Sequence, residues 1–261
     1  MPFVEPHVAM HPTKSSLDRF PTEWDEEPFP GGSYLPHDRP RAAYAAMISD
    51  LDRRVGEIIE ALEKHSLRDR TLIVFTSDNG TTHPINPKTH FHVGGVDANF
   101  FESTLDLRGY KGSVYEGGIR VPTIVSLPGV IEEGAVNDSP SYFADWFPTL
   151  THAIGKPTDH PVDGENLWPA LSKNETHVRT KPMLWVYPEY GGQFAVRIGD
   201  YKVVRQRLKT KKPGAWEVYH IAEDRGETTD LAATQGELIE QAIAILKSET
   251  SPNELFPLSF D

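Results

Sequence analysis

The sequence predicts an α/β fold, in which part of a mostly parallel sheet flanked by helices is followed by a small C-terminal antiparallel sheet and a helix. A long amphipathic helical pattern runs directly into a short apolar segment, an order typical of α/β domains. Short strand-like runs then gather toward the C-terminus, where hairpins are expected. We therefore predict an α/β domain over residues 1–178 and a smaller subdomain over residues 179–261.

The composition excludes several classes of protein. The chain has 261 residues, a formal net charge of −12 and no cysteine. Because phosphate neutralisation requires a clustered excess of lysine and arginine, we expect no nucleic-acid partner. No run approaches the roughly 18 apolar residues of a membrane span, and the first residues lack the pattern of a signal peptide. Without thiolates, any bound metal ion must take oxygen or imidazole ligands.

The first predicted domain begins with a loop, a helix and a strand. Residues 6–40 are rich in Pro, Gly, His and Asp without a sustained period, which indicates an irregular surface segment. Residues 41–64 carry apolar side chains at steps of three and four and predict a helix. The apolar run at residues 71–77 shows no polar alternation, so we expect a strand that is covered on both faces.

Two further elements complete this domain. Residues 121–127 form a second apolar run, and Pro122 places it near a sheet edge or at a strand start. Residues 144–154 predict a helix that ends at a glycine. The apolar residues on one face of this helix are Phe147, Leu150 and Ile154.

The C-terminal subdomain is predicted from four short runs rich in apolar and β-branched residues. These runs are residues 183–187, 193–198, 201–205 and 216–219. Gly199 and Asp200 form a two-residue hairpin turn between the second and third runs. A helix over about residues 235–247, with one apolar face, closes this antiparallel sheet.

A candidate cation site directly follows the first predicted strand. Asp78 offers a charged oxygen and Asn79 a neutral carbonyl oxygen, a pairing that suits a hard cation such as Ca²⁺ or Mg²⁺. In open parallel sheets, ligands gather at the carboxyl ends of strands. Asp-Asn-Gly is also a common turn sequence, and that alternative stays open.

A glycine-rich segment from Leu107 to Pro122 is a candidate oxyanion site. Its glycines let the backbone approach a ligand closely, and Lys111 presents a point charge. The alternative is a plain connection between strands with a solvated lysine.

These segments, in this order, resemble the sulfatase family of the alkaline-phosphatase-like superfamily. In that family a strand ending in Ser-Asp-Asn-Gly precedes a Lys-Gly-Ser-x-x-Glu-Gly-Gly-x-Arg-x-Pro segment. Here the two motifs stand at residues 77–80 and 111–122. The resemblance covers essentially the whole chain. The further segments that carry it are Pro2–Val8, Val93–Asp97, Phe100-Phe101, Asp145–Leu150, Asp163-Gly164 and Tyr219–Leu231.

The resemblance implies roles for four residues. Asp78 and Asn79 take the places of two metal ligands, for a cation that is usually Ca²⁺ in the family, with Mg²⁺ as an alternative. Lys111 takes the place of a lysine that binds the sulfate oxygens. His7 takes the place of a histidine that assists at the leaving group or the sulfate. The family also uses a formylglycine, made from Cys or Ser in a Cys/Ser-x-Pro-x-Arg motif.

The chain lacks the formylglycine motif, so its resemblance is to the C-terminal part of a sulfatase. It has no cysteine, and no Ser-x-Pro sequence in it continues to the required arginine. The family's early pair of metal-binding aspartates is also missing. Two ligands cannot hold a hard cation that takes six or more oxygens, and no nucleophile is present. We therefore expect a fragment that is inactive alone and that lacks an N-terminal part of the same enzyme.

The implied function is that of a sulfuric ester hydrolase, arylsulfatase-like, acting on a sulfated carbohydrate or small molecule. A complete member of the family is expected in the periplasm or outside the cell. One alternative is a phosphodiesterase or phosphonate hydrolase of the same superfamily, with a similar fold and metal. The other is a non-catalytic remnant that binds sulfate through Lys111 without turnover.

Two groups of side chains near these motifs allow more than one interpretation. The first group is His83, His90 and His92, which we expect to be exposed loop residues near the site, with substrate contact or a zinc site as alternatives. The second group is Trp185, Tyr187 and Tyr190. These aromatic residues are expected to pack the small sheet against the main domain, and a wall that stacks on a sugar is the alternative.

Overall fold

The computed structural model describes residues 1–82, 91–251 and 253–257. Two compact units make up the chain, and their segments alternate along the sequence. Unit 1 consists of Met1–Thr71, Asn79–Leu105 and Gly109–Lys111, and unit 2 of Leu72–Asp78, Asp106–Arg108 and Gly112–Asp261. The division into residues 1–178 and 179–261 stays a prediction.

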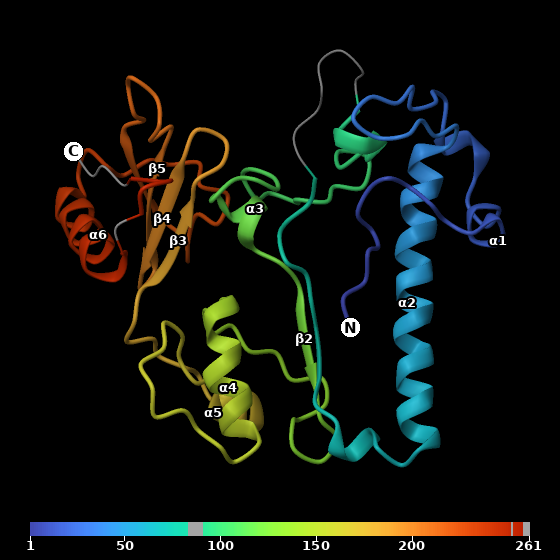
Figure 1. Cartoon of the computed structure of the whole chain (residues 1–261), viewed down its shortest axis with the longest axis horizontal. Coiled ribbons are helices and arrows are strands. Elements are labelled where there is room, and N and C mark those ends of the chain that lie inside the picture. Colours follow the sequence, from blue (N-terminus) through green and yellow to red (C-terminus); the bar gives the residue numbers. More distant parts are fainter. Residues whose placement is uncertain (83–90, 252, 258–261) are drawn as a thin grey trace. The chain divides into compact units, whose positions relative to one another are not determined.

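Unit 1 contains one long helix, α2, over Pro40–Lys64 (Figure 1). Pro40 stands in its first turn, where a missing N–H costs no hydrogen bond. The carboxylate of Asp25 accepts from the backbone N–H groups of Arg41 at 2.7 Å and Ala42 at 3.2 Å, which satisfies two free donors at the helix start. The predicted helix at 41–64 is confirmed. Among the described residues, no helix combines the length and the apolar character needed to cross a membrane.

The apolar face of α2 is well covered only near its N-terminal end. Ala43 and Met47 pack in a buried cluster with Met10 and Val96. Beyond Asp50 the apolar stripe is only partly buried. The residues of this partly buried stripe are Leu51, Val55, Ile58, Ile59 and Leu62.

The rest of unit 1 is mostly irregular, as the composition of residues 6–40 predicts. Its short elements are α1 (Lys14–Leu17), η1 (Thr22–Trp24), η2 (Arg68–Arg70) and η3 (Val93–Gly95). The side chain of Thr13 caps α1 by accepting from the backbone N–H of Ser16.

Unit 2 begins with a two-stranded sheet of β1 (Ile73–Thr76) and β2 (Thr123–Ser126). Both strands were predicted, but they pair antiparallel, with Ile73 opposite Ser126. No parallel pair occurs in the described part of the chain, so the expected parallel sheet is not confirmed. The residues of β1 are partly exposed rather than covered on both faces. An apolar run predicts that a strand forms, whereas the direction of pairing and the burial of that strand depend on residues distant in sequence.

The second sheet of unit 2 is antiparallel and has the strand order β3-β4-β5-β6. Its strands are β3 (Met183–Tyr187), β4 (Gln193–Ile198), β5 (Tyr201–Gln206) and β6 (Trp216–His220). Gly199, with φ of +57°, lies in the hairpin turn between β4 and β5. All four predicted strands and the turn are therefore confirmed.

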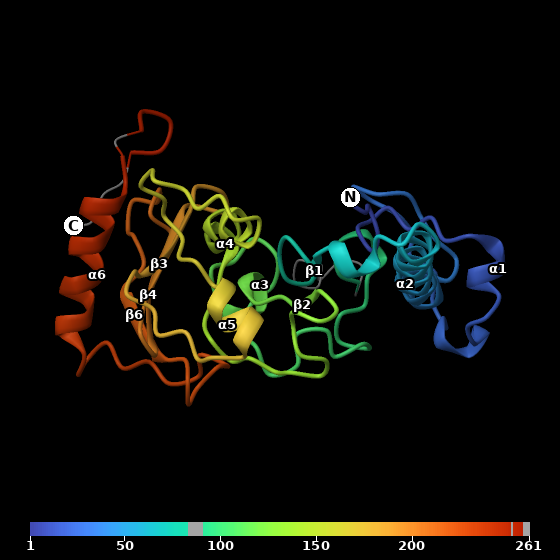
Figure 2. The ribbon, with the colours of Figure 1, turned by 90° about the horizontal axis from the view of Figure 1, so that it is seen from below.

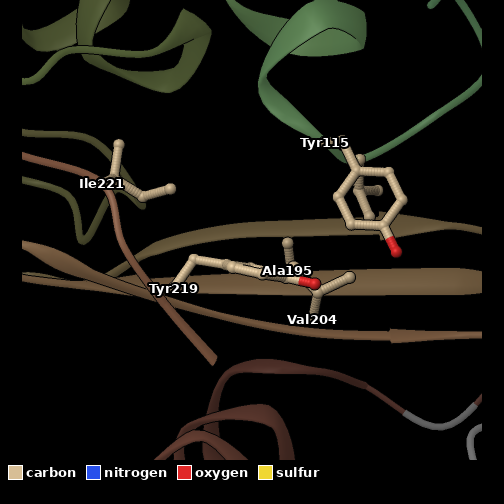
Figure 3. Packing of buried hydrophobic residues seen from close by; sticks show 6 residues of the cluster. Tyr115, Ala195, Val204, Tyr219 and Ile221 are labelled. Carbon is tan, nitrogen blue, oxygen red and sulfur yellow. The ribbon is translucent and has the colours of Figure 1, made fainter. Parts of the chain in front are cut away.

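Alternate side chains of this sheet enter two different clusters, as expected for a sheet with both faces covered. On one face, Phe194, Val196 and Val203 pack with Ala242 and Leu246 of α6 (Gly236–Glu249), which lies along the sheet in Figure 2. On the other face, the cluster drawn in Figure 3 combines sheet residues with the segment that follows Lys111. Its members are Val114, Tyr115, Ala195, Val204, Tyr219 and Ile221.

The remaining helices of unit 2 are short. They are α3 (Glu116–Ile119), η4 (Phe143–Asp145), α4 (Trp146–Ala153) and α5 (Trp168–Lys173). The predicted helix at 144–154 is therefore confirmed, but its apolar face is open. Phe147 is 58% exposed and Ile154, just after the helix, is 70% exposed.

A charged cluster ties three segments of unit 2 together. Arg179 donates to both carboxylate oxygens of Asp145, at 2.7 and 3.1 Å. Glu165 accepts from the backbone N–H of Thr180 at 2.9 Å and lies 2.7 Å from Nε2 of His177. Burial on its own would raise the pKa of Glu165, but its hydrogen bonds lower that pKa to about 2. The carboxylate therefore stays ionised at neutral pH and holds these segments together.

A buried lysine connects the glycine-rich motif to the second sheet. Lys202 of β5 has no exposed surface, and its Nζ lies 2.8 Å from Glu116 and 2.9 Å from Glu227. Burial would raise the pKa of Glu116, but the Lys202 ammonium outweighs it and the pKa lies below its ordinary value. Burial raises the pKa of Glu227, against the opposing pull of Lys202. One ammonium thus holds two carboxylates from segments far apart in sequence.

Replacing this ammonium should destabilise the protein strongly. Lys202→Met keeps most of the length of the side chain but leaves Glu116 and Glu227 buried without the ammonium. We therefore expect a loss of about 3–5 kcal/mol in the free energy of unfolding. Urea denaturation of the full chain measures it. Arg225→Met is the matched control, because it breaks an exposed ion pair with Asp106 and should leave the free energy of unfolding nearly unchanged. Equal losses in the two variants would contradict this account of Lys202.

Candidate active site

The structure brings two of the four predicted site residues into direct contact. Nζ of Lys111 lies 3.1 Å from Nε2 of His7, within hydrogen-bond distance. Both residues belong to unit 1. His7 is exposed and Lys111 is partly buried, so solvent and ligands can reach the pair.

The contacts of the His7 ring define its tautomer. Nδ1 lies 2.5 Å from the carbonyl oxygen of Val8, and a carbonyl oxygen can only accept. Nδ1 must therefore carry the proton. The ammonium of Lys111 can only donate, so Nε2 must accept. Together the two contacts select the neutral imidazole with its proton on Nδ1.

A backbone hydrogen bond within unit 1 links Lys111 to the segment that begins at Asn79. The backbone N–H of Lys111 donates to the carbonyl oxygen of Thr81 at 2.7 Å, and Thr81 follows Asn79 by two residues. Asn79 is partly buried, and Asp78, which precedes it directly, is exposed. The Ser77 hydroxyl lies 3.5 Å from Oδ1 of Asp78, at the limit of a hydrogen bond.

These residues alone do not fit a complete metal site. Asp78 and Asn79 offer at most three side-chain oxygens, whereas Ca²⁺ takes about 6–8 oxygen ligands and Mg²⁺ about six. Within residues 1–82, 91–251 and 253–257, no group of three or more His, Cys, Asp or Glu side chains could hold a metal ion.

Gln193, which the sequence analysis did not single out, supports the segment after Lys111. Its Nε2 donates to the carbonyl oxygen of Gly112 at 2.7 Å, and its Oε1 accepts from the backbone N–H of Val114 at 3.3 Å. Gln193 is only 3% exposed. The only sequence signal for this role was a polar residue at the start of the apolar strand β4, and it did not indicate which segment Gln193 contacts.

One of the three histidines predicted to be exposed loop residues is buried. His92 is 1% exposed, and its Nδ1 accepts from the backbone N–H of Ala98 at 3.2 Å. Burial lowers the pKa of His92 and so favours the neutral ring. The expectation of exposure was therefore wrong for His92, because a tight turn at Gly94 and Gly95 folds the backbone around it. His83 and His90 lie outside the described residues.

The three aromatic residues of the C-terminal part divide between packing and exposure. Trp185 and Tyr187 pack against the cluster of Figure 3, and Trp185 meets Tyr142 edge-on at 5.7 Å. Tyr190 stacks on Tyr187 with ring centroids 6.0 Å apart, yet it is 59% exposed. A Cβ at Gly112 would lie 2.7 Å from the Tyr190 ring, so this ring covers the residue that follows Lys111.

The tautomer of His7 can be measured directly. In long-range ¹H–¹⁵N spectra of the full chain, we expect the neutral His7 ring to carry its proton on Nδ1. Lys111→Met removes the donor to Nε2 and should shift the Nε2 resonance, whereas the proton should stay on Nδ1 because the Val8 carbonyl oxygen still accepts it. Lys14→Met, which removes an exposed lysine paired with Asp18, should leave the His7 signals unchanged. A proton on Nε2 in the wild-type chain would contradict the assignment.

Comparison with known proteins relates these motifs to one family. The model described as Sulfatase matches residues 3–156, and the model described as N-sulphoglucosamine sulphohydrolase, C-terminal, matches residues 109–250. A sulfatase from Formosa agariphila is 30% identical over 217 residues, which cover 74% of this chain and 36% of that protein. The steryl-sulfatase of Rattus norvegicus is 36% identical over 138 residues, covering 52% of this chain and 22% of that protein.

A solved structure extends the similarity to the fold. The crystal structure of Ps i-CgsB in complex with k-i-k-neocarrahexaose shares 26% identity and a TM-score of 0.73, covering 94% of this chain and 48% of that one. This chain spans less than half the length of each of these three proteins. Since the Sulfatase model alone matches more than half of its residues, the chain belongs to the sulfatase family.

Proposed function

We propose that this chain is the sulfate-binding part of a sulfuric ester hydrolase that acts on a sulfated carbohydrate. The observation that carries the proposal is the 3.1 Å contact between Nζ of Lys111 and Nε2 of His7 in a member of the sulfatase family. An accessible ammonium that a neutral ring nitrogen already orients is well suited to meet an anion.

The chemistry of the pair follows from counting its donors. An ammonium has three N–H groups, and His7 takes one of them, which leaves two for the oxygens of a sulfate ester. Such charge-assisted hydrogen bonds are roughly twice as strong as neutral ones. We assign Lys111 to sulfate binding and His7 to orienting the ammonium and facing the leaving group.

Asp78 and Asn79 are proposed as two of the ligands of a Ca²⁺ ion, with Mg²⁺ as the alternative. A carboxylate and an amide oxygen are ligands that hard cations prefer. The side chains of these two residues do not complete such a site. We therefore propose that the other ligands, and the formylglycine nucleophile that this chain lacks, belong to an N-terminal part of the same enzyme, and that this chain alone is inactive.

Uncovered apolar surface supports the proposal of a further part. In unit 2, Phe147 and Ile154 at α4 and Ile124 of β2 are more than half exposed. In unit 1, the stripe of α2 beyond Asp50 is only partly buried. Exposed apolar side chains that gather into a patch commonly mark surfaces that another polypeptide covers. Ps i-CgsB, of which this chain covers 48%, has about as much chain again to provide such cover.

A carbohydrate is proposed as the sulfated substrate on two grounds. Ps i-CgsB was solved in complex with k-i-k-neocarrahexaose. Tyr190 also presents a largely exposed ring against Gly112, the residue that follows Lys111 in the chain. Aromatic faces with a polar tip suit partly wet contacts such as those of a sugar.

Binding of inorganic sulfate to the full chain tests the role of Lys111. Lys111→Met should weaken the affinity about tenfold or more, because hydrogen bonds to a charged group contribute about 1.5–3 kcal/mol. Calorimetry or NMR titration at low ionic strength measures it. Lys14→Met, which removes the same charge from an exposed helix in unit 1, should bind as the wild type does. Equal affinities for Lys111→Met and the wild type would exclude Lys111 from the site.

Calcium titration of the same chain tests the incomplete metal site. We expect a dissociation constant weaker than about 0.1 mM, since two ligating side chains leave most of the coordination to water. Asp78→Asn should therefore change the calorimetric signal little. Micromolar binding that Asp78→Asn abolishes would mean that this chain supplies a complete set of ligands.

A further inference from the structure

A tight turn at residues 92–96 has no role in the proposed function, although it belongs to the same unit as His7 and Lys111. The backbone N–H of His92 donates to Val96 O at 3.1 Å, and the N–H of Gly95 donates to His92 O at 3.0 Å. The ring of His92 accepts from the N–H of Ala98. These hydrogen bonds hold the backbone of the turn in one conformation, against which neighbouring side chains can pack.

One contact of this turn is with the residue that follows His7. Gly94 has φ of +74°, and a Cβ at this position would lie 2.4 Å from Cγ1 of Val8. Val8 therefore rests directly on the backbone of the turn, at a distance that any side chain on Gly94 would forbid. Val8 also packs in the buried cluster of Met10 and Val96. Since Nδ1 of His7 bonds to the Val8 carbonyl oxygen, the position of Val8 limits where the His7 ring can point.

A second contact is with the residue that precedes Lys111. The rings of His92 and Tyr110 have centroids 5.6 Å apart and are inclined by 51°. Burial keeps the His92 ring neutral, so it can pack as an aromatic side chain. Its Nε2 has no hydrogen-bond partner among the described residues, which leaves packing and the Nδ1 acceptor as the uses of this ring.

We propose that the turn at residues 92–96 positions the sulfate-binding pair, with Gly94 fixing His7 through Val8 and His92 fixing Lys111 through Tyr110. Gly94 and His92 are positioning residues, since they act through Val8 and Tyr110. That this arrangement serves sulfate binding rests on the proposed function, whereas the positioning of the His7 and Lys111 side chains does not depend on it.

Gly94→Ala in the full chain tests the Val8 contact. The new methyl group must displace Val8, so the ¹⁵N resonances of the His7 ring should leave their wild-type positions. The affinity for inorganic sulfate should fall about tenfold, because binding groups need placement within about 0.5 Å.

Gly129→Ala is the matched control for this variant. Gly129 has φ of +75°, and nothing lies within 4 Å of an added Cβ, so the backbone strain is the same and no neighbour is displaced. This variant should keep the wild-type His7 resonances and sulfate affinity. An effect of Gly94→Ala that Gly129→Ala reproduces would overturn the proposal.

Three further variants make the test independent of the folding of Gly94→Ala. Val8→Gly combined with Gly94→Ala removes the atoms that the methyl group meets and should return the His7 resonances toward wild type. Val8→Ala alone keeps the glycine and should still move them. His92→Ala should shift the backbone amide resonance of Lys111, and an unshifted amide would exclude His92. Unchanged His7 resonances in Val8→Ala would overturn the role of Gly94.

The two proposals can fail separately. If the His7 and Lys111 resonances move as expected but the wild-type chain does not bind inorganic sulfate, the positioning stands and the proposed function fails. If sulfate binds through Lys111 but the resonances ignore the turn, the positioning fails alone.

Discussion

The hydrogen bond between the Lys111 ammonium and the His7 imidazole joins residues that are 104 positions apart. Each is fixed through the backbone, Lys111 by its N–H bond to Thr81 and His7 by its bond to the Val8 carbonyl oxygen. On a freely moving loop, a lysine side chain would occupy many rotamers, and few of them would reach His7. The irregular part of unit 1, with its cluster at the start of α2, therefore acts as the frame of this one contact.

Local patterns were sufficient to predict most elements of the fold. Helix α2, the four strands of the second sheet and the turn at Gly199 follow from periodicity and turn chemistry, which neighbouring residues determine. The direction and cover of β1 were not predictable in this way, since an apolar run looks the same whether its partner is parallel, antiparallel or missing. The open apolar face of α4 was missed for the same reason.

The candidate site was predictable in its residues but not in its supports. The motifs and their family resemblance identified Lys111 and His7, and the structure places them in contact. The roles of Gln193 and His92 were not predicted. Gln193 bonds to a backbone 81 residues away, and His92 is buried by a turn with two glycines, and neither arrangement produces a local sequence pattern. Supporting residues of this kind are defined by long-range contacts.

The ion pairs of Lys202 also determine when the glycine-rich motif can reach its final form. Glu116, Lys202 and Glu227 come from segments spread over more than a hundred residues, so their ion pairs depend on long-range contacts being in place. Until Glu227 arrives, the segment from Gly112 to Arg120 lacks part of its electrostatic anchor. A protease that removed the chain beyond β6 would therefore loosen a motif about a hundred residues upstream of the cut, without touching Lys111 or His7.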